Sequence, residues 1–308
     1  MAKDNSKVST YKVSPPPRIN SVFVTRIGDA LIIAFLTLLC LTCVVPFLHL
    51  LAKSISSNNA VLAKSVYLLP KEITLDAYKS IFRDGQLVHS MLYSALVTAL
   101  FTVLGLVTTI MAAYPLSRSR LAGRPVLTFI IMFTMYFGAG LIPEYLLMSR
   151  LRLLDSMWVL ILPLIFSPYN FLIMKSFFLN SIPISLEESA YLDGASNFQI
   201  LTQIVLPLSK PILATIGLFL AVGRWNAFQD SKFYIVTKGK HIIQYLLSLM
   251  VLSSADTSLS IQDAAAAATT PEVLQAAAVM FATLPIICIY PFLQKYFVKG
   301  VMIGAVKG

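Results

Sequence analysis

The feature that most constrains this chain is a series of six apolar runs, each long enough to cross a lipid bilayer. A transmembrane helix needs about 20 consecutive, predominantly apolar residues. Only 12% of the residues are charged and 57% are hydrophobic, whereas soluble domains carry roughly a quarter charged residues. The sequence therefore predicts an all-α polytopic membrane protein with six transmembrane helices, at residues 30–51, 91–116, 126–148, 156–178, 204–222 and 273–297.

These runs divide the chain into a short tail and one membrane domain. Residues 1–28 are polar and contain Pro15, Pro16 and Pro17, so we predict a flexible cytoplasmic tail. Residues 29–308 form the predicted membrane domain, with long loops at 53–90 and 224–271 and a polar loop at 183–207. The first run is long and has no small-residue cleavage site, which predicts a retained anchor instead of a signal peptide.

The distribution of charge predicts the orientation of the chain. The net charge is +10, but the basic residues are scattered over loops and ends, which argues against a nucleic-acid partner. Cytoplasmic loops of membrane proteins are enriched in Lys and Arg. The short loop with Arg118, Arg120 and Arg124 is entirely basic, so we interpret these arginines as topology determinants. We predict cytoplasmic N- and C-termini (N-in, C-in), extracytoplasmic loops at 53–90 and 224–271, and a cytoplasmic loop at 183–207.

The segment 185–207 is the only polar, acidic and glycine-containing passage between two apolar runs in the second half of the chain. Ser185 followed by Glu188 predicts a capping box at a helix start. Gly194 is expected to end or bend that helix, and Ser196 to cap a second one that runs to Ile204, with Pro207 at the start of the next apolar run. A loop that only joins two spans does not need this much structure, so we expect a partner to dock on it.

Several classes of catalytic and binding site are missing from the sequence. It contains no phosphate-binding G-x-x-x-x-G-K-[ST] loop, no His-Glu zinc helix and no G-x-S-x-G elbow. The three histidines have no metal-ligand spacing, and Cys40 and Cys43 lie inside an apolar run, where packing is the expected role. We therefore predict no catalytic residue, no metal site and no cofactor bound by this chain.

The 185–207 segment resembles the EAA loop of permease subunits of ABC importers. That pattern is E-A-A, three residues, Gly, nine residues, Ile, one residue, Leu-Pro. The matching positions here are Glu188, Ser189, Ala190, Gly194, Ile204, Leu206 and Pro207, with Ser in place of the first Ala. The segments 137–147, 206–216, 221–228 and 290–308 are similar to carbohydrate-importer permeases for complex oligosaccharides such as aldouronate or alginate fragments. Arg224 departs from that subfamily, which often has His before Trp-Asn.

The resemblance implies a type I ABC importer permease fold and a non-catalytic role in oligosaccharide import. It implies these partners: a second homologous permease chain, two cytoplasmic ATPase subunits that bind ATP and Mg, an extracytoplasmic sugar-binding protein, and the bilayer of a bacterial cell membrane. The 185–195 helix would be the coupling helix that seats on the ATPase. The coupling residues implied are Leu186, Glu187, Glu188, Ser189, Ala190, Leu192, Asp193, Gly194, Ala195 and Pro207. Leu186 and Leu192 would supply apolar contacts to the partner, or would pack toward lipid.

A substrate pathway for sugars should present aromatic faces and planar hydrogen-bonding groups. The residues of those types in or beside the spans are Tyr136, Glu144, Tyr145, Tyr169, Asn170, Trp225 and Asn226. For each of them a structural role, in helix packing or in the aromatic belt of a membrane protein, is the competing interpretation.

Three alternative functions remain open at this point. One is a permease of the same superfamily for another solute, and another is an ATP-independent secondary transporter or channel. The third is a membrane scaffold for another enzyme. The chain shows no internal repeat and few ionisable groups within its spans, which argues against a secondary transporter.

Overall fold

The computed structural model describes residues 22–256 and 270–305, and every regular element in that part of the chain is helical. The chain divides into two compact units, Met1–His49 and Leu50–Gly308. Most of the predicted N-terminal tail and residues 257–269 of the predicted second long loop lie outside the described residues.

The first unit contains most of helix α1 (Val22–Ser54), which confirms a helix at the first apolar run. Residues Gly28–Ser54 are long and apolar enough to cross a membrane, and Pro46 lies inside the helix without ending it. The last turn of α1 belongs to the second unit. Its Ser54 side chain is buried there and accepts a hydrogen bond from the Tyr78 hydroxyl at 3.0 Å.

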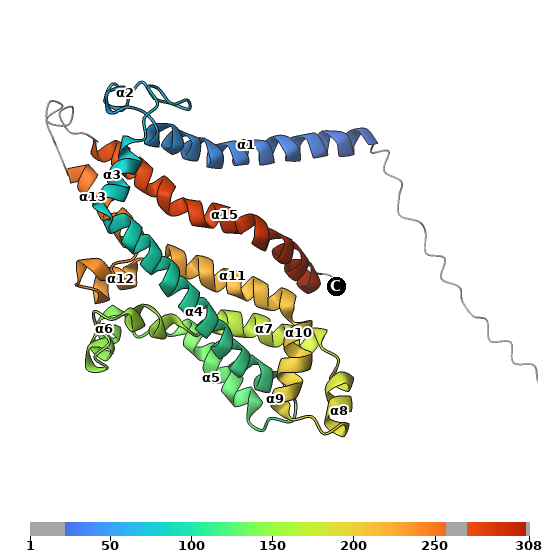
Figure 1. The fold of residues 1–308 in the computed structure, drawn as a ribbon. Coiled ribbons are helices and arrows are strands. Elements are labelled where there is room, and N and C mark those ends of the chain that lie inside the picture. Colours follow the sequence, from blue (N-terminus) through green and yellow to red (C-terminus); the bar gives the residue numbers. More distant parts are fainter. Residues whose placement is uncertain (1–21, 257–269, 306–308) are drawn as a thin grey trace, which may run out of the picture. The chain divides into compact units, whose positions relative to one another are not determined.

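The second unit is a bundle of long helices joined by short ones (Figure 1). Its elements before the polar loop are α2 (Asn58–Leu62), α3 (Asp76–Asp84), α4 (Gln86–Ser117), α5 (Arg124–Tyr136), α6 (Leu141–Arg150), the 3₁₀ turns η1 (Met157–Leu160) and η2 (Leu162–Leu164), and α7 (Pro168–Ser181). The polar loop and the rest of the chain form α8 (Ile184–Leu192), α9 (Asn197–Gln199), the π-helix η3 (Ile200–Val205), α10 (Leu206–Leu208), α11 (Lys210–Asn226), α12 (Gln229–Tyr234), the 3₁₀ turn η4 (Lys238–Lys240), α13 (Ile243–Asp256) and α15 (Pro271–Ala305).

Helix α4 is the central element, because α7 and α11 both pack along it (Figure 1). Its buried face repeats every three to four residues and is built largely from small side chains. Lipid tails are as apolar as Leu, so helices in a membrane associate through close van der Waals packing, which small residues allow. The residues of that face include Ser90, Ser94, Val97, Phe101, Gly105, Thr109 and Ala113.

Gly105 is the point of closest approach on that face. A Cβ atom there would lie 3.1 Å from Leu220 Cδ1 on α11 and 3.2 Å from the Ile165 carbonyl oxygen before α7. Both contacts are tighter than ordinary van der Waals packing, so glycine lets the three segments meet. Phe171 on α7 and Ile216 on α11 are completely buried in the core around this contact.

Three of the six predicted spans are not single helices. The 126–148 span breaks at Gly140, which has a φ of +85°, and α5 and α6 differ in direction by 114°. The 156–178 span begins as 3₁₀ turns that bend by 51° into α7. The 204–222 span bends by 82° beside Ser209, because Pro207 and Pro211 remove two backbone donors from the helical ladder. Hydropathy does not register such breaks, since glycine and proline occur inside apolar runs.

The segments predicted as long loops also contain helices. Within the predicted 53–90 loop, α3 buries Ala77 and Ile81. Asp155 holds the segment before η4 in place. Its carboxylate accepts hydrogen bonds from the Thr237 hydroxyl at 2.6 Å and from the Val236 and Thr237 amides, and it pairs with Lys240. These hydrogen bonds, that of the Thr237 side chain first, hold the pKa of Asp155 well below its usual value.

Candidate functional site

The polar loop forms a helix, a glycine turn and a second helix, as predicted. Gly194 has a φ of +84°, a left-handed conformation that favours glycine, and it ends α8. Ser196 caps the second helix through a capping box. The Gln199 amide donates to Ser196 Oγ at 3.3 Å, and the Ser196 amide donates to Gln199 Oε1 at 2.8 Å.

The predicted capping box at Ser185 and Glu188 is wrong. The N-cap of α8 is Pro183, with no side-chain cap, so Ser185 already lies inside the helix. Pro183 has the extended backbone that is usual at an N-cap, with a φ of −61° and a ψ of 129°, and the helix begins at Ile184. The Ser185 carbonyl instead accepts a hydrogen bond from the Ser189 hydroxyl at 2.9 Å.

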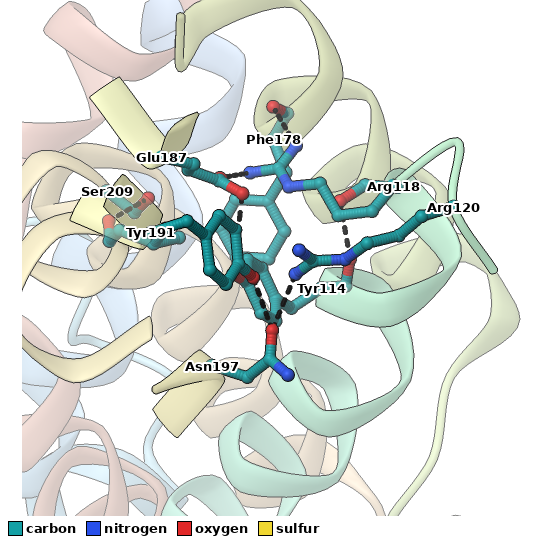
Figure 2. A network of polar contacts seen from close by, with 10 residues as sticks. Tyr114, Arg118, Arg120, Phe178, Glu187, Tyr191, Asn197 and Ser209 are labelled. Atoms are coloured by element: carbon teal, nitrogen blue, oxygen red, sulfur yellow. Dashed lines mark hydrogen bonds and ion pairs between the residues drawn. The ribbon is translucent and has the colours of Figure 1, made fainter. Parts of the chain in front are cut away.

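A buried ion pair joins this loop to the end of α4. The Glu187 carboxylate pairs with the Arg118 guanidinium, and the two side chains are only 4% and 8% exposed. Arg118 also donates from Nη1 to the Phe178 carbonyl at the end of α7, at 3.1 Å. Figure 2 shows Arg118 between Glu187 and Phe178, with Tyr114 beneath them. One arginine thus connects α4, α7 and α8.

Tyr114 completes this contact from one turn earlier on α4. Its hydroxyl lies 3.5 Å from Glu187 Oε2, and its ring centroid lies 5.1 Å from the Arg118 guanidinium carbon. Its ring also packs edge-to-face on Phe178, with the centroids 6.3 Å apart. An ion pair removed from water is favourable only when further hydrogen bonds and good geometry accompany it. Tyr114 and the Phe178 carbonyl supply these here.

A second, exposed contact lies beside the first. Arg120 Nη2 donates to Asn197 Oδ1 at 2.6 Å, and the Arg120 guanidinium carbon lies 4.5 Å from the centroid of the Tyr191 ring. The Tyr191 hydroxyl donates to the same Asn197 oxygen. The residues after α4 therefore contact both helices of the loop, α8 through Tyr191 and α9 through Asn197 (Figure 2).

These contacts add a role to the arginines that the sequence interpretation assigned only to topology. Arg118 and Arg120 both bind the polar loop directly. One signal in the sequence was available. Glu187 and Tyr191 are four residues apart, so they share a helix face, and that face needed a basic partner from another segment.

The ten predicted coupling residues divide into an inner and an outer group. Glu187 is buried, and Ala190 and Ala195 are partly buried against the core. Leu192 is 90% exposed, the most exposed of the large apolar side chains in α8. The remaining predicted coupling residues are also exposed: Leu186, Glu188, Ser189, Asp193, Gly194 and Pro207.

The seven predicted pathway residues do not form one site. Glu144 and Asn226 line one cavity of about 390 Å³, and the Tyr145 ring stacks on Tyr234 of the same cavity, with the centroids 6.1 Å apart. Trp225 is buried and lines a different, apolar cavity of about 400 Å³. The remaining three lie apart from both cavities: Tyr136 and Tyr169 are exposed, and Asn170 is buried within α7.

Arg224, which departs from the resembling subfamily, is a structural anchor. Its guanidinium is buried and pairs with both carboxylate oxygens of Asp230, with Nη2 3.0 Å from Oδ1. It also donates to the Leu160 carbonyl at 2.9 Å. This arginine thereby joins the end of α11 to α12 and to η1.

Comparisons with known proteins agree with this architecture. Residues 105–303 match the family model of the binding-protein-dependent transport system inner membrane component. The chain is 41% identical to the polygalacturonan/rhamnogalacturonan transport system permease protein YtcP of Bacillus subtilis (strain 168), over 92% of this chain and 99% of that protein. It is 32% identical to the galactooligosaccharides transport system permease protein GanQ of the same organism, over 93% and 97%.

A solved structure has the same fold. It is a crystal structure of a bacterial ABC transporter involved in the import of the acidic polysaccharide alginate. One of its chains superimposes with a TM-score of 0.82 and 33% identity, over 89% of this chain and 98% of that one.

Proposed function

Because this chain belongs to the family of binding-protein-dependent transport system inner membrane components, we propose that it is a permease subunit that imports oligosaccharides. It has the type I ABC permease fold. The names of its relatives, for polygalacturonan/rhamnogalacturonan, galactooligosaccharides and alginate, support a sugar as the cargo. In this proposal the chain is non-catalytic, and separate ATPase subunits bind ATP and Mg.

The observation that carries the proposal is the attachment of the polar loop to α4 on one face, while its other face stays exposed. Glu187 holds α8 to Arg118. Glu188 and Leu192 are exposed in this chain. We assign that outer face to the ATPase subunit. A large exposed apolar side chain beside a carboxylate is the kind of surface that a protein partner covers.

The proposed assembly has this chain in a bacterial cell membrane, with six spans and both termini in the cytoplasm. It pairs with a second homologous permease chain above two ATPase subunits. A sugar-binding protein docks on the opposite side, and the segment after Trp225 is its proposed contact. The chain has three helices long and apolar enough to span, or up to six if each bent pair is one span, in the part that the structure describes.

Coupling in such an assembly is a free-energy linkage between two sites, and it is reciprocal. Closure of the ATPase dimer around ATP would displace α8 as a rigid lever. The Arg118–Glu187 pair would transmit that displacement to α4 and, through the Phe178 carbonyl, to α7. The spans would then alternate between inward- and outward-facing states, and the binding protein would release sugar to the outward-facing one.

The test is to express both permease chains, the ATPase and the binding protein together, and to measure ATPase stimulation by the sugar-loaded binding protein in proteoliposomes. Leu192→Asp should abolish co-purification of the ATPase with the permease pair, because it places a charge in a buried contact. Leu69→Asp is the matched control, since Leu69 is also a highly exposed leucine but lies in the 53–90 loop. If Leu192→Asp keeps the ATPase and its full stimulation, the coupling assignment is wrong. Sugar uptake without any ATPase would instead favour a secondary carrier.

A further inference from the structure

One cavity, of about 390 Å³, lies between α6, the 3₁₀ turn η2 and the junction of α11 with α12, and both polar and apolar residues line it. This volume falls within the roughly 300–1,000 Å³ range of small-molecule sites. Phe228 and Phe233 line it and are 36% and 40% exposed, so part of each ring is free to meet a ligand. Gln229 lines it as well and supplies an amide group, and Asn226 supplies its amide oxygen, since the Asn226 Nδ2 donates to the Val222 carbonyl at 2.9 Å. Aromatic faces combined with planar hydrogen-bonding groups suit a sugar ring.

The charges that line this cavity do not balance. Asp230 is neutralised by the buried Arg224, and its Oδ1 also accepts the Ser231 amide at 3.0 Å. Glu144 has no hydrogen-bond or ion-pair partner for its carboxylate among residues 22–256 and 270–305. It lies in the first turn of α6, where the helix dipole favours a carboxylate.

The carboxylates of this cavity also act on a third residue of its lining. Burial, then the Glu144 carboxylate and Asp230, raise the pKa of Tyr234, which also lines the cavity. Among the described lining residues there is no Lys or Arg. An acidic sugar that enters would therefore meet an unpaired carboxylate and no cation to offset it.

We propose that this cavity is a subsite for neutral sugar units and that Glu144 excludes uronates from it. The inference rests on the proposed import of oligosaccharides and narrows the class of sugar. The proposed cargo of this chain therefore differs in charge from the sugars in the names of two of its relatives, because alginate and polygalacturonan are built from acidic sugars. A like charge at short range in a partly hydrated site weakens binding by roughly tenfold.

The test compares two probes that share a skeleton and differ in charge, trigalacturonate and its fully methyl-esterified, neutral form. Binding of each is measured by saturation-transfer NMR on the assembled complex of both permease chains and the ATPase, without binding protein. The wild type should bind the ester about tenfold more tightly. Glu144→Gln keeps the shape of the side chain and should remove most of that preference by strengthening binding of trigalacturonate. Glu272→Gln, at an exposed glutamate of α15 that pairs with Lys53, is the matched control and should leave the preference unchanged.

A salt titration of the wild type gives a second readout that needs no variant. Screening should reduce the preference as NaCl rises, because the Debye length falls from about 10 Å at 0.1 M to about 3 Å at 1 M. Equal binding of both probes by the wild type, or an unchanged preference in Glu144→Gln, would overturn the proposal. The proposal is also overturned if the complex binds neither probe while sugar-loaded binding protein still stimulates its ATPase. In that case the proposed function stands. If stimulation and uptake both fail, the proposed function falls and takes this subsite with it.

Discussion

Glu187 of α8 and Arg118 at the end of α4 form an ion pair that is almost completely buried, although 69 positions separate them in the sequence. The pair connects the polar loop to the central helix of the bundle. Since Arg118 also binds the Phe178 carbonyl, a displacement of α8 has direct contacts through which to reach both α4 and α7.

Breaking the pair from one side should destabilise the protein strongly. Arg118→Met leaves the Glu187 carboxylate buried without its partner, which costs about 3–5 kcal/mol. The double variant Arg118→Met/Glu187→Met replaces both charges with apolar groups and should recover much of that loss. Thermal unfolding of the solubilised complex measures both effects. A double variant as unstable as the single one would show that the loss does not come from an unpaired Glu187 carboxylate.

Gly194 should be needed for its backbone conformation and for the space it leaves. A Cβ atom there meets nothing of this chain within 4 Å, so Gly194→Ala suffers only the cost of its φ of +84°, roughly 1–2 kcal/mol. Asn tolerates this conformation better but adds more bulk. If Gly194 is needed only for its backbone conformation, the complex with Gly194→Asn should show stronger ATPase stimulation than the complex with Gly194→Ala. If a partner approaches closely, both should fail, and Gly194→Glu should abolish stimulation while the spans stay folded. Full stimulation in Gly194→Glu would contradict the coupling role.

Gly105 should be the least replaceable glycine of α4 and α11. Gly105→Ala brings a Cβ atom to 3.2 Å from the Ile165 carbonyl oxygen, and backbone yields less easily than a side chain. We expect a loss of about 1–3 kcal/mol, typical of overpacking. Gly217→Ala is the matched control, because its Cβ atom would lie at 3.4 Å from Leu106 Cδ1, an ordinary contact. Thermal stability of the two variants should differ clearly, and equal values would exclude a close approach at Gly105.

Asp155 should make the 235–241 segment sensitive to acid. Its pKa is lowered in the folded state, so its stabilising effect is complete above its ordinary pKa of about 3.8 and is lost as the pH falls below that value. Asp155→Asn lacks this contribution, so the stability gap between wild type and variant should shrink below about pH 4. Asp76→Asn, in an exposed pair with Lys79, should have little effect at any pH. Hydrogen exchange of residues 235–241 from pH 6 to pH 3 measures the difference, and a gap that is constant over this range would contradict the assignment.

Prediction from the sequence was most accurate where a local pattern decides the structure. The apolar run of α4, the turn at Gly194 and the cap at Ser196 were all predicted, because hydropathy, glycine and a side-chain cap act within a few residues. The bend at Gly140 between α5 and α6 was missed, since a run of apolar residues does not reveal how glycine turns the chain. The capping box at Ser185 was wrong because Pro183 begins the helix two residues earlier than that pattern requires.

For the candidate sites, too, the sequence predicted the local motif but not the contacts between distant segments. The sequence placed Glu187 and Glu188 side by side in one motif, and only the packing of α8 separates a buried carboxylate from an exposed one. Of the seven predicted pathway residues, Glu144 and Asn226 line a shared cavity, and Trp225 lines another. Which aromatic residues meet a cavity depends on the bends between helices, and these are set by contacts between distant segments.

By itself the sequence determined that this protein is helical, that it belongs in a membrane, and that its 185–207 segment matches the EAA pattern. Those properties are sums over neighbouring residues, so the order of amino acids is enough to read them. Only the tertiary structure decided that Arg118 pairs with Glu187 and that Glu144 is left without a partner among the described residues. The pairing of charges depends on which helices meet, and in a close-packed bundle that is settled by the shapes of whole faces, such as the small-residue face of α4.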